Sequence, residues 1–231
     1  MTVSRSLVFP LCLVAGPLLV IVAGTLHPDL AGDGAAQLTT IAQCRAWSAI
    51  HWTFLFSFPL ALTGLVGVAR IHAGSSGENA VRAGLITATF AYTAWMVIVA
   101  FMAGSGWALA QVFTQADPGM TATRAVFVYD MIHPFALATQ RVAGFALGLS
   151  TCLFGWGVVD GKALPHWVGT SGMGAGAVAM AFALGFPENT KADQAAFVLP
   201  VLWQMVTGAV LLARAKAHDA PRPTVGGVRA A

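Results

Sequence analysis

Long apolar runs, separated by short polar segments, make up most of this chain. Several of them contain the roughly 20 residues that an α-helix needs to cross the hydrocarbon core of a bilayer. The runs predict six transmembrane helices, with boundaries set by prolines and polar residues. These helices lie at residues 7–26, 46–70, 84–108, 134–158, 166–186 and 195–214. We therefore expect an all-α integral membrane bundle with both termini on the same side.

The six predicted helices belong to a single transmembrane domain, residues 1–214. The segment that follows, residues 215–231, combines basic side chains with Pro221, Pro223 and glycines. Such a composition cannot bury enough apolar surface to offset the entropy of folding. We predict that this segment is a disordered basic cytoplasmic tail.

The composition and the placement of charge support a membrane location. Hydrophobic residues make up 57% of the chain and charged residues 9%, whereas an ordinary soluble domain carries about 25% charged residues. Basic residues concentrate in cytoplasmic loops. Those on the side of the termini are Arg5, Arg70, Arg82, Lys162, Arg214, Lys216, Arg222 and Arg229, and those on the other side are Arg45, Arg124 and Lys191. This pattern predicts a multi-pass protein of the inner (plasma) membrane with cytoplasmic termini and the lipid bilayer as its partner. It also accounts for the pI near 9.0 without a nucleic-acid partner.

The stretch "YDMIHPFALATQRVAG", residues 129–144, is unusually polar for a membrane helix. Pro134 suits the first turn of a helix, so the predicted helix begins there and His133 lies at its start. Arg141 then lies too deep to remain at the surface. A charge at that depth is costly and usually faces the bundle interior. The expected partners of Arg141 are Asp130, Gln140, Gln204 and the carbonyls freed by Pro59 and Pro200. Arg141 is either an interhelical clamp or a contact to an anionic ligand.

Three histidines share the outer level of the predicted bundle. His27 closes the first helix, His51 follows the start of the second, and His133 opens the fourth. Imidazoles and nearby carboxylates can converge on a divalent metal ion, whether copper, iron or zinc. Alternatively, His51 and His133 are the axial ligands of a b-type haem, with Arg141 or Arg45 near a propionate. The simplest alternative is that each histidine merely suits the interface, with an apolar body and a wet tip.

These residues lead to three functional hypotheses. In the first, the chain is an oxidoreductase that acts on a small or lipophilic molecule. There His27, His51 and His133 hold the metal or haem, Arg141 holds an anionic group, and Asp130 orients a histidine or relays a proton. In the second, the chain is a proton-coupled carrier or a small-molecule-binding protein without a metal, in which Gln140, Arg141 and Gln204 line the polar path. The third is a structural subunit of a larger complex.

Two helices carry patterns of packing residues. Small residues recur along residues 166–186, with Gly172 and Gly176 in a small-xxx-small pair, which is typical of close helix contacts. This face either packs on a neighbour in the same chain or forms a homodimer. Along residues 84–108, a stripe of large side chains predicts either packed core or the wall of an apolar pocket. The stripe consists of Tyr92, Trp95, Met96, Val99 and Met102.

Two short motifs and the six-helix plan carry a resemblance. The motifs are "LHP", residues 26–28, and "AIHW", residues 49–52. With the six predicted helices, they resemble small six-helix membrane proteins of actinobacteria, a group of unassigned function. The resemblance implies the fold and adds nothing catalytic.

Overall fold

The computed structural model describes residues 7–115, 119–186 and 191–219, with the side chains of 191–193 and 217–219 left aside. Within these ranges the chain is helical and has no strand. The helices are α1 (Val8–Leu26), α2 (Gly34–Gln43), α3 (Trp47–Ile71), α4 (Glu78–Phe101), the π-helix η1 (Met102–Gly106), α5 (Trp107–Gln115), α6 (Met120–Gly161), α7 (His166–Gly185) and α8 (Lys191–Asp219). Six helical segments are long and apolar enough to cross a membrane, which confirms the predicted fold class.

Three of the predicted spans agree closely with the structure, and the others are longer. α1, α3 and α7 begin and end within a residue or so of the expected positions. α8 continues to Asp219, into the segment predicted as a tail. The rest of that segment, and the basic residues Arg5, Arg222 and Arg229, lie outside the described residues. α4, η1 and α5 form one helical segment of 38 residues.

The prediction that Pro134 begins a helix is wrong. α6 begins at Met120 and runs for 42 residues, with Pro134 inside it. His133 is therefore an interior residue of α6. A proline inside a helix removes one backbone hydrogen bond, but tertiary packing can keep the helix continuous. Here the segment before Pro134 is anchored because Ala125 and Tyr129 are buried.

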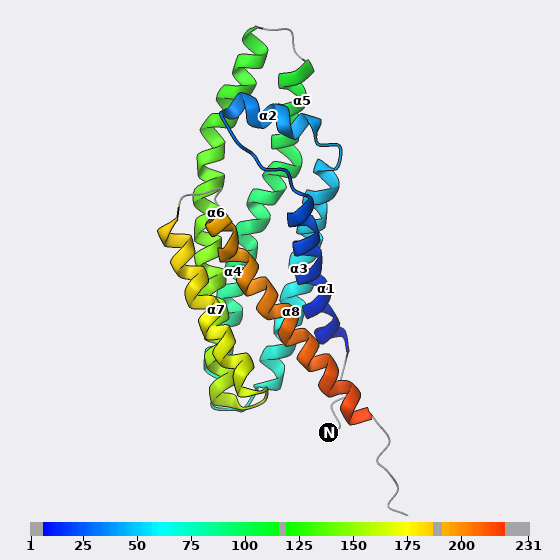
Figure 1. The fold of residues 1–231 in the computed structure, drawn as a ribbon, viewed down its shortest axis with the longest axis vertical. Helices are drawn as coiled ribbons and strands as arrows, with labels where there is room; N and C mark the ends of the chain where they lie inside the picture. The colour runs from blue at the N-terminus through cyan, green and yellow to red at the C-terminus, as the bar shows by residue number, and fades with distance from the viewer. Residues whose placement is uncertain (1–6, 116–118, 187–190, 220–231) are drawn as a thin grey trace, which may run out of the picture.

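The two longest helical segments extend well beyond the rest of the bundle. At 1.5 Å per residue, α6 is about 63 Å long and the α4–η1–α5 segment about 57 Å, roughly twice the ~30 Å hydrocarbon core. Their far ends meet α2, which lies across them (Figure 1). We call α2, α5 and the first half of α6 the cap, and the opposite end, where α1 begins and α8 ends, the terminal end.

α2 was not predicted from the sequence. It is a ten-residue helix whose first turn is capped by Asp33, which accepts a hydrogen bond from the Ala36 amide at 2.9 Å. Asp33 is a favourable N-cap because its carboxylate satisfies a free backbone donor. Leu38 and Ile41 of α2 are buried against Tyr129 of α6. The cap thus has its own apolar core, separate from the core of the bundle.

The bundle itself is packed through glycines. A Cβ on Gly155 of α6 would lie 2.6 Å from the carbonyl oxygen of Gly169 in α7, and one on Gly176 would lie 2.4 Å from that of Gly148. Such contacts are possible only without side chains, as in other close membrane helix pairs. The small-residue face predicted on residues 166–186 therefore packs on a neighbour in the same chain.

α8 crosses the front of the bundle obliquely (Figure 1). Near the terminal end it meets α1, where a Cβ on Gly208 would lie 3.1 Å from the Cβ of Leu13. Towards the cap α8 lies beside α7 and α6 instead. The upper parts of α1 and α8 are therefore separated, and the space between them leads into the site described next.

Candidate functional site

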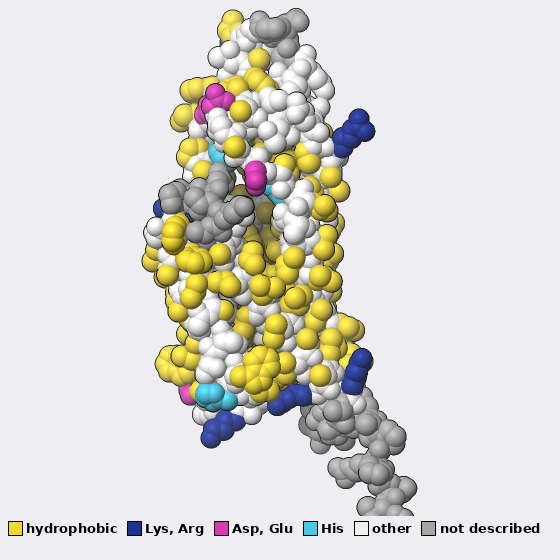
Figure 2. Space-filling model, viewed as in Figure 1, with side chains coloured by type: hydrophobic (Ala, Val, Ile, Leu, Met, Phe, Trp, Pro, Cys, Tyr) yellow, Lys and Arg dark blue, Asp and Glu magenta, His cyan; other side chains and the backbone are white. Residues whose placement is uncertain are grey.

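A cavity of about 920 Å³ opens between α1, α3, α4, α6 and α8, on the cap side of the bundle. Its size is near the top of the range of roughly 300–1,000 Å³ that small-molecule sites occupy. Figure 2 shows this face hollowed, with acidic and histidine side chains at the rim and hydrophobic side chains below. The polar lining residues are Thr25, His27, Asp29, His51, His133, Gln140 and Gln194.

The structure brings His27, His51 and His133 to this one cavity from three different elements. His27 ends α1 because it precedes Pro28, which disfavours helix at the residue before it, and its Nδ1 lies 2.8 Å from the Pro28 carbonyl oxygen. His51 lies one turn into α3, with Nδ1 2.8 Å from the Trp47 carbonyl oxygen. The ring centroids of His27 and His51 are 5.2 Å apart.

His133 reaches the cavity from α6, and its ring stacks on Tyr129 at a centroid distance of 4.9 Å. In the ranges that the structure describes, no group of three or more His, Cys, Asp or Glu side chains is arranged to hold a metal ion. The predicted three-histidine metal site therefore gains no support from the geometry. The shared cavity remains, with two histidine rings in contact and a third on the facing helix.

Trp47 fixes the two histidines that touch. Its ring lies 4.2 Å from that of His51 and 5.1 Å from that of His27. Its indole Nε1 donates a buried hydrogen bond of 2.8 Å to the carbonyl oxygen of Met102 in η1. A π-helix shifts the backbone pairing to i→i+5 and is often found at functional sites. Neither the role of Trp47 nor η1 was predicted from the sequence, where the two glycines of "MAGSG" within a helical run are the feature that accompanies η1.

The remaining walls are apolar and partly aromatic. Trp95, Val99 and Met102, three members of the predicted stripe on residues 84–108, line the cavity together with Phe54 and Phe197. The Trp95 and Phe197 rings stack at a centroid distance of 3.8 Å. The pocket-wall interpretation of the stripe thus holds for these three residues. Tyr92 belongs to the packed core instead, where its hydroxyl donates to Gln204 at 2.8 Å.

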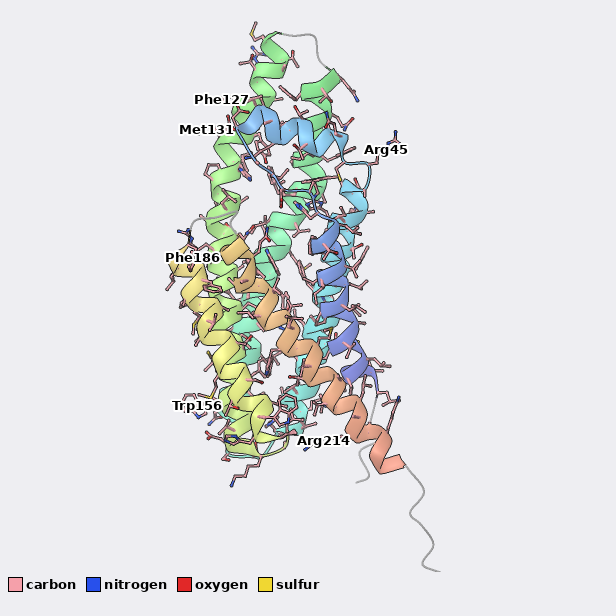
Figure 3. All side chains as sticks on the ribbon, in the orientation of Figure 1. Arg45, Phe127, Met131, Trp156, Phe186 and Arg214 are labelled. Atoms are coloured by element: carbon pink, nitrogen blue, oxygen red, sulfur yellow. The ribbon has the colours of Figure 1, made fainter. Side chains whose placement is uncertain are left out.

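Of the three residues predicted to bind substrate, only Gln140 lines the cavity. Gln204 is buried in the bundle with Tyr92. Arg141 was expected to point into the bundle, but its Nη2 donates to the Phe186 carbonyl oxygen at 2.9 Å, at the end of α7; Phe186 is labelled in Figure 3. The last carbonyls of a helix attract a cation because the helix dipole leaves negative charge there.

Asp130 and Arg45 lie outside the cavity. Asp130 is exposed, and its carboxylate lies so close to Gly34 that a Cβ there would overlap it. Gly34 begins α2, where the helix dipole favours a negative charge. The carboxylate of Asp130 thus lies beside the N-terminus of α2. Arg45 is exposed and points away from the helices (Figure 3).

Burial lowers the pKa of His27 below its ordinary value of 6.5. The hydrogen bond to the Pro28 carbonyl and the charge of Asp29 oppose this shift, but burial is the largest cause. Burial disfavours a charged imidazole because the protein solvates it less well than water does. At neutral pH the His27 ring is therefore uncharged and can both donate and accept a hydrogen bond.

Comparisons of the chain with models of protein families, with curated proteins and with solved structures find no match.

Proposed function

We propose that this chain is a multi-pass protein of the plasma membrane that binds a small lipophilic molecule in the cavity lined by His27, His51 and His133. One observation carries the proposal: His27, His51, His133 and Gln140, which are far apart in the sequence, line a single cavity whose other walls are apolar. A few convergent polar groups in an otherwise apolar pocket are the usual chemistry of a small-molecule site.

The polar groups are held in place before any ligand arrives. The Nδ1 atoms of His27 and His51 are fixed by backbone carbonyls, and Trp47 packs on both rings. Nε2 of His51 has no hydrogen-bond partner among the described residues, so it is free to contact a ligand. Preorganised groups of this kind improve affinity because little conformational freedom is lost on binding.

The proposal places the cavity in the outer half of the bilayer. Helix ends and loops at the terminal end carry five basic residues with described side chains: Arg70, Arg82, Lys162, Arg214 and Lys216. Two lie at the opposite end, Arg124 in the cap and Arg45 in the loop between α2 and α3. The excess of Lys and Arg on one side favours that side as cytoplasmic. The terminal end is then cytoplasmic, and the cap lies outside the cell.

A variant whose new side chain fills the cavity tests the binding function. Gly24 lines the cavity, and the nearest atom to a Cβ there would be Phe54 Cζ at 4.0 Å. Gly24→Phe should therefore occupy the cavity without a backbone clash. Gly174 of α7 has nothing within 4 Å of such a Cβ, so Gly174→Phe is a matched control on the outer surface.

The readout is photolabelling of the purified chain in liposomes with an aryl diazirine, followed by peptide mass spectrometry. Val99 and Val201 line the cavity and are enclosed by the bundle, so labelling of either residue reports a probe inside the cavity. We expect both to be labelled in the wild type and in Gly174→Phe, and to lose labelling in Gly24→Phe. No labelling of either valine in the wild type, or equal labelling in all three proteins, would overturn the proposal.

A second candidate is the haem-dependent oxidoreductase, with His51 and His133 as axial ligands. It is favoured because both line the same cavity and because the Nδ1 contact of His51 to a backbone carbonyl is the outer-shell support that ligating histidines usually have. A bound haem would supply one-electron chemistry. The visible spectrum of the purified protein tests it: a Soret band that is lost in both His51→Ala and His133→Ala supports haem, and a colourless protein rules this candidate out.

A further inference from the structure

We infer that the cavity takes a neutral amphiphile with a hydroxyl or carbonyl headgroup, which enters sideways from the lipid between α1 and α8. This inference rests on the proposed function and adds the class of ligand and its route. It depends on three features of the cavity: an opening in its side, the separation of polar and apolar lining residues, and the charges near the polar end.

The cavity has a wall that faces lipid. Val198 and Leu202 of α8 line it, and they are 45% and 38% exposed. On the opposite side of the opening, Gly24 and Thr25 of α1 line the cavity and are exposed as well. Residues that face both the cavity and the outside mark its rim. The rim lies on two helices that cross the membrane, so the opening faces hydrocarbon.

The opening exists because α1 and α8 touch only lower in the bundle. Their close contact is at Gly208 and Leu13, and towards the cap the two helices separate (Figure 1). Figure 2 shows the hollow on this face, with hydrophobic side chains below it. A lipophilic molecule can therefore move from the bilayer into the cavity without passing through water.

Polar and apolar groups lie at different heights in the cavity. His27, Asp29 and Gln194 are at or beyond the cap-side ends of α1 and α8, whereas Val20, Val201 and Leu202 lie one to two turns further into these helices. A ligand that satisfies both regions has a polar head towards the cap and an apolar body towards the bundle. The flat stack of Trp95 on Phe197 forms part of the apolar wall.

We expect an uncharged headgroup because the described residues at the polar end offer hydrogen bonds and no positive charge. Among the described lining residues there is no Lys or Arg, and the one acidic side chain is that of Asp29. Arg141 is directed to Phe186 and does not line the cavity. Burying an anion beside a carboxylate without a cation is costly. Histidine rings and glutamine amides instead satisfy a hydroxyl or carbonyl, because they both donate and accept.

The headgroup is tested with two photoreactive probes of equal chain length, hexadecanol and hexadecanoic acid, each with a diazirine at the same carbon and a terminal alkyne. The full chain is reconstituted in phosphatidylcholine liposomes at alkaline pH, where the acid is ionised. We expect the alcohol to label Val99 and Val201 about tenfold more than the acid, a difference of ~1.4 kcal/mol. Equal labelling, or stronger labelling by the acid, would overturn the neutral headgroup.

The route is tested with Val198→Trp, which narrows the opening, and with Val178→Trp as the control. Val178 of α7 is similarly exposed, at 43%, but does not line the cavity. We expect the initial rate of labelling of Val99 and Val201 by the alcohol to fall several-fold in Val198→Trp alone. An unchanged rate would overturn the lateral route. If the aryl diazirine still reaches these valines while the alcohol does not, the ligand class is wrong and the binding site stands.

Discussion

In the bundle, α6 and α7 approach until backbone nearly meets backbone at Gly155 and Gly169, whereas in the cap α2 is held by large side chains such as Leu38, Trp47 and Tyr129. Each region also contains one buried hydrogen bond between a tyrosine and a glutamine. Tyr92 donates to Gln204 in the bundle, and Tyr129 donates to Gln37 in the cap, both at 2.8 Å.

This difference indicates which interactions stabilise each region. In lipid, apolar side chains gain little from leaving an apolar solvent, so helices associate through close packing of small residues. In water, burying large apolar side chains is itself favourable, at about 25 cal/mol per Å². The bundle combines close glycine contacts with a core of large side chains, whereas α2 of the cap is held mainly by large apolar side chains.

The largest effect is expected at the glycine contact of the bundle. A Cβ on Gly155 would lie 2.6 Å from backbone atoms of α7, so Gly155→Leu must push α6 and α7 apart. We expect it to lower the free energy of unfolding by about 3 kcal/mol, measured by denaturant unfolding in detergent. Gly174→Leu, where the side chain meets open space, should have little effect. Equal losses would mean that close packing does not stabilise the bundle.

The two tyrosine–glutamine pairs should differ when each hydroxyl is removed. Tyr92→Phe leaves Gln204, which is 1% exposed, without its partner in a dry core, and Tyr129→Phe leaves Gln37, which is 8% exposed and nearer to water. Since an unsatisfied buried polar group costs ~1–3 kcal/mol, we expect losses of about 2 kcal/mol for Tyr92→Phe and about 1 kcal/mol for Tyr129→Phe. The reverse order would show that the cap is the drier region.

A double variant provides the control for this comparison. Replacing both partners of a buried hydrogen bond by apolar groups removes the unsatisfied atom. Tyr92→Phe with Gln204→Leu should therefore recover part of the stability that Tyr92→Phe loses. The same unfolding measurement, with each single variant beside the double, gives the coupling energy of the pair.

Lowering the pH should reduce the stability of the folded state unequally through His72 and His27. Burial lowers the pKa of His72, at the terminal end of α3, and of His27, beside the cavity, below the ordinary value of 6.5. The unfolded chain then binds protons that the folded chain does not, so stability is full above about pH 6.5 and falls as the pH drops below it. The effect should be greater at His72, which is completely buried and has no partner for Nε2 among the described residues.

The measurement is the free energy of unfolding at a series of pH values. We expect His72→Leu to flatten the loss of stability below pH 6.5 more than His27→Leu does, because Asp29 partly compensates a charge on His27. A pH dependence that neither variant changes would assign the titration to other groups.

The smallest effect is expected at Arg141. Its guanidinium caps the end of α7 through the Phe186 carbonyl, and such charge–dipole contacts contribute about 0.3–1 kcal/mol. Arg141→Gln should therefore cost about 0.5 kcal/mol and leave photolabelling of the cavity unchanged. Arg124→Gln, at an exposed position of the same helix, is the control. If Arg141→Gln loses labelling and Arg124→Gln does not, Arg141 contributes to the ligand site.

The sequence predicted the spans because apolar length is a local property. α1, α3 and α7 could be read from runs bounded by residues such as Pro28 and Pro165. The cap was missed for a physical reason: α2 is short and only moderately apolar, and its stability comes from contacts with α5 and α6 that a local pattern does not reveal. The helix start predicted at Pro134 was wrong because packing of the preceding residues keeps the helix continuous through the proline.

The site was predicted only in part, again because a local sequence pattern does not reveal contacts between helices. His27 and His51 share a level because each lies near a helix end, whereas His133 reaches the same cavity from the interior of α6. Whether a side chain faces the cavity depends on helix rotation, which the sequence left open for Gln204 and Arg141. The roles of Trp47 and η1 required knowledge of which helices adjoin.

α1 and α8 cross near Gly208 and Leu13 and separate towards the cap, so a change in their crossing angle changes the width of the opening between them. Gly208 is the pivot, and Val198 at the mouth of the cavity lies ten residues away along α8, a lever arm of about 15 Å. A tilt of roughly 10° about that pivot moves the tip by some 2–3 Å, enough to admit or reject a methyl branch. Hinge motions of this size need no change in the rest of the fold, so on the proposed lateral route the crossing angle of the two helices would limit the width of a ligand that can enter.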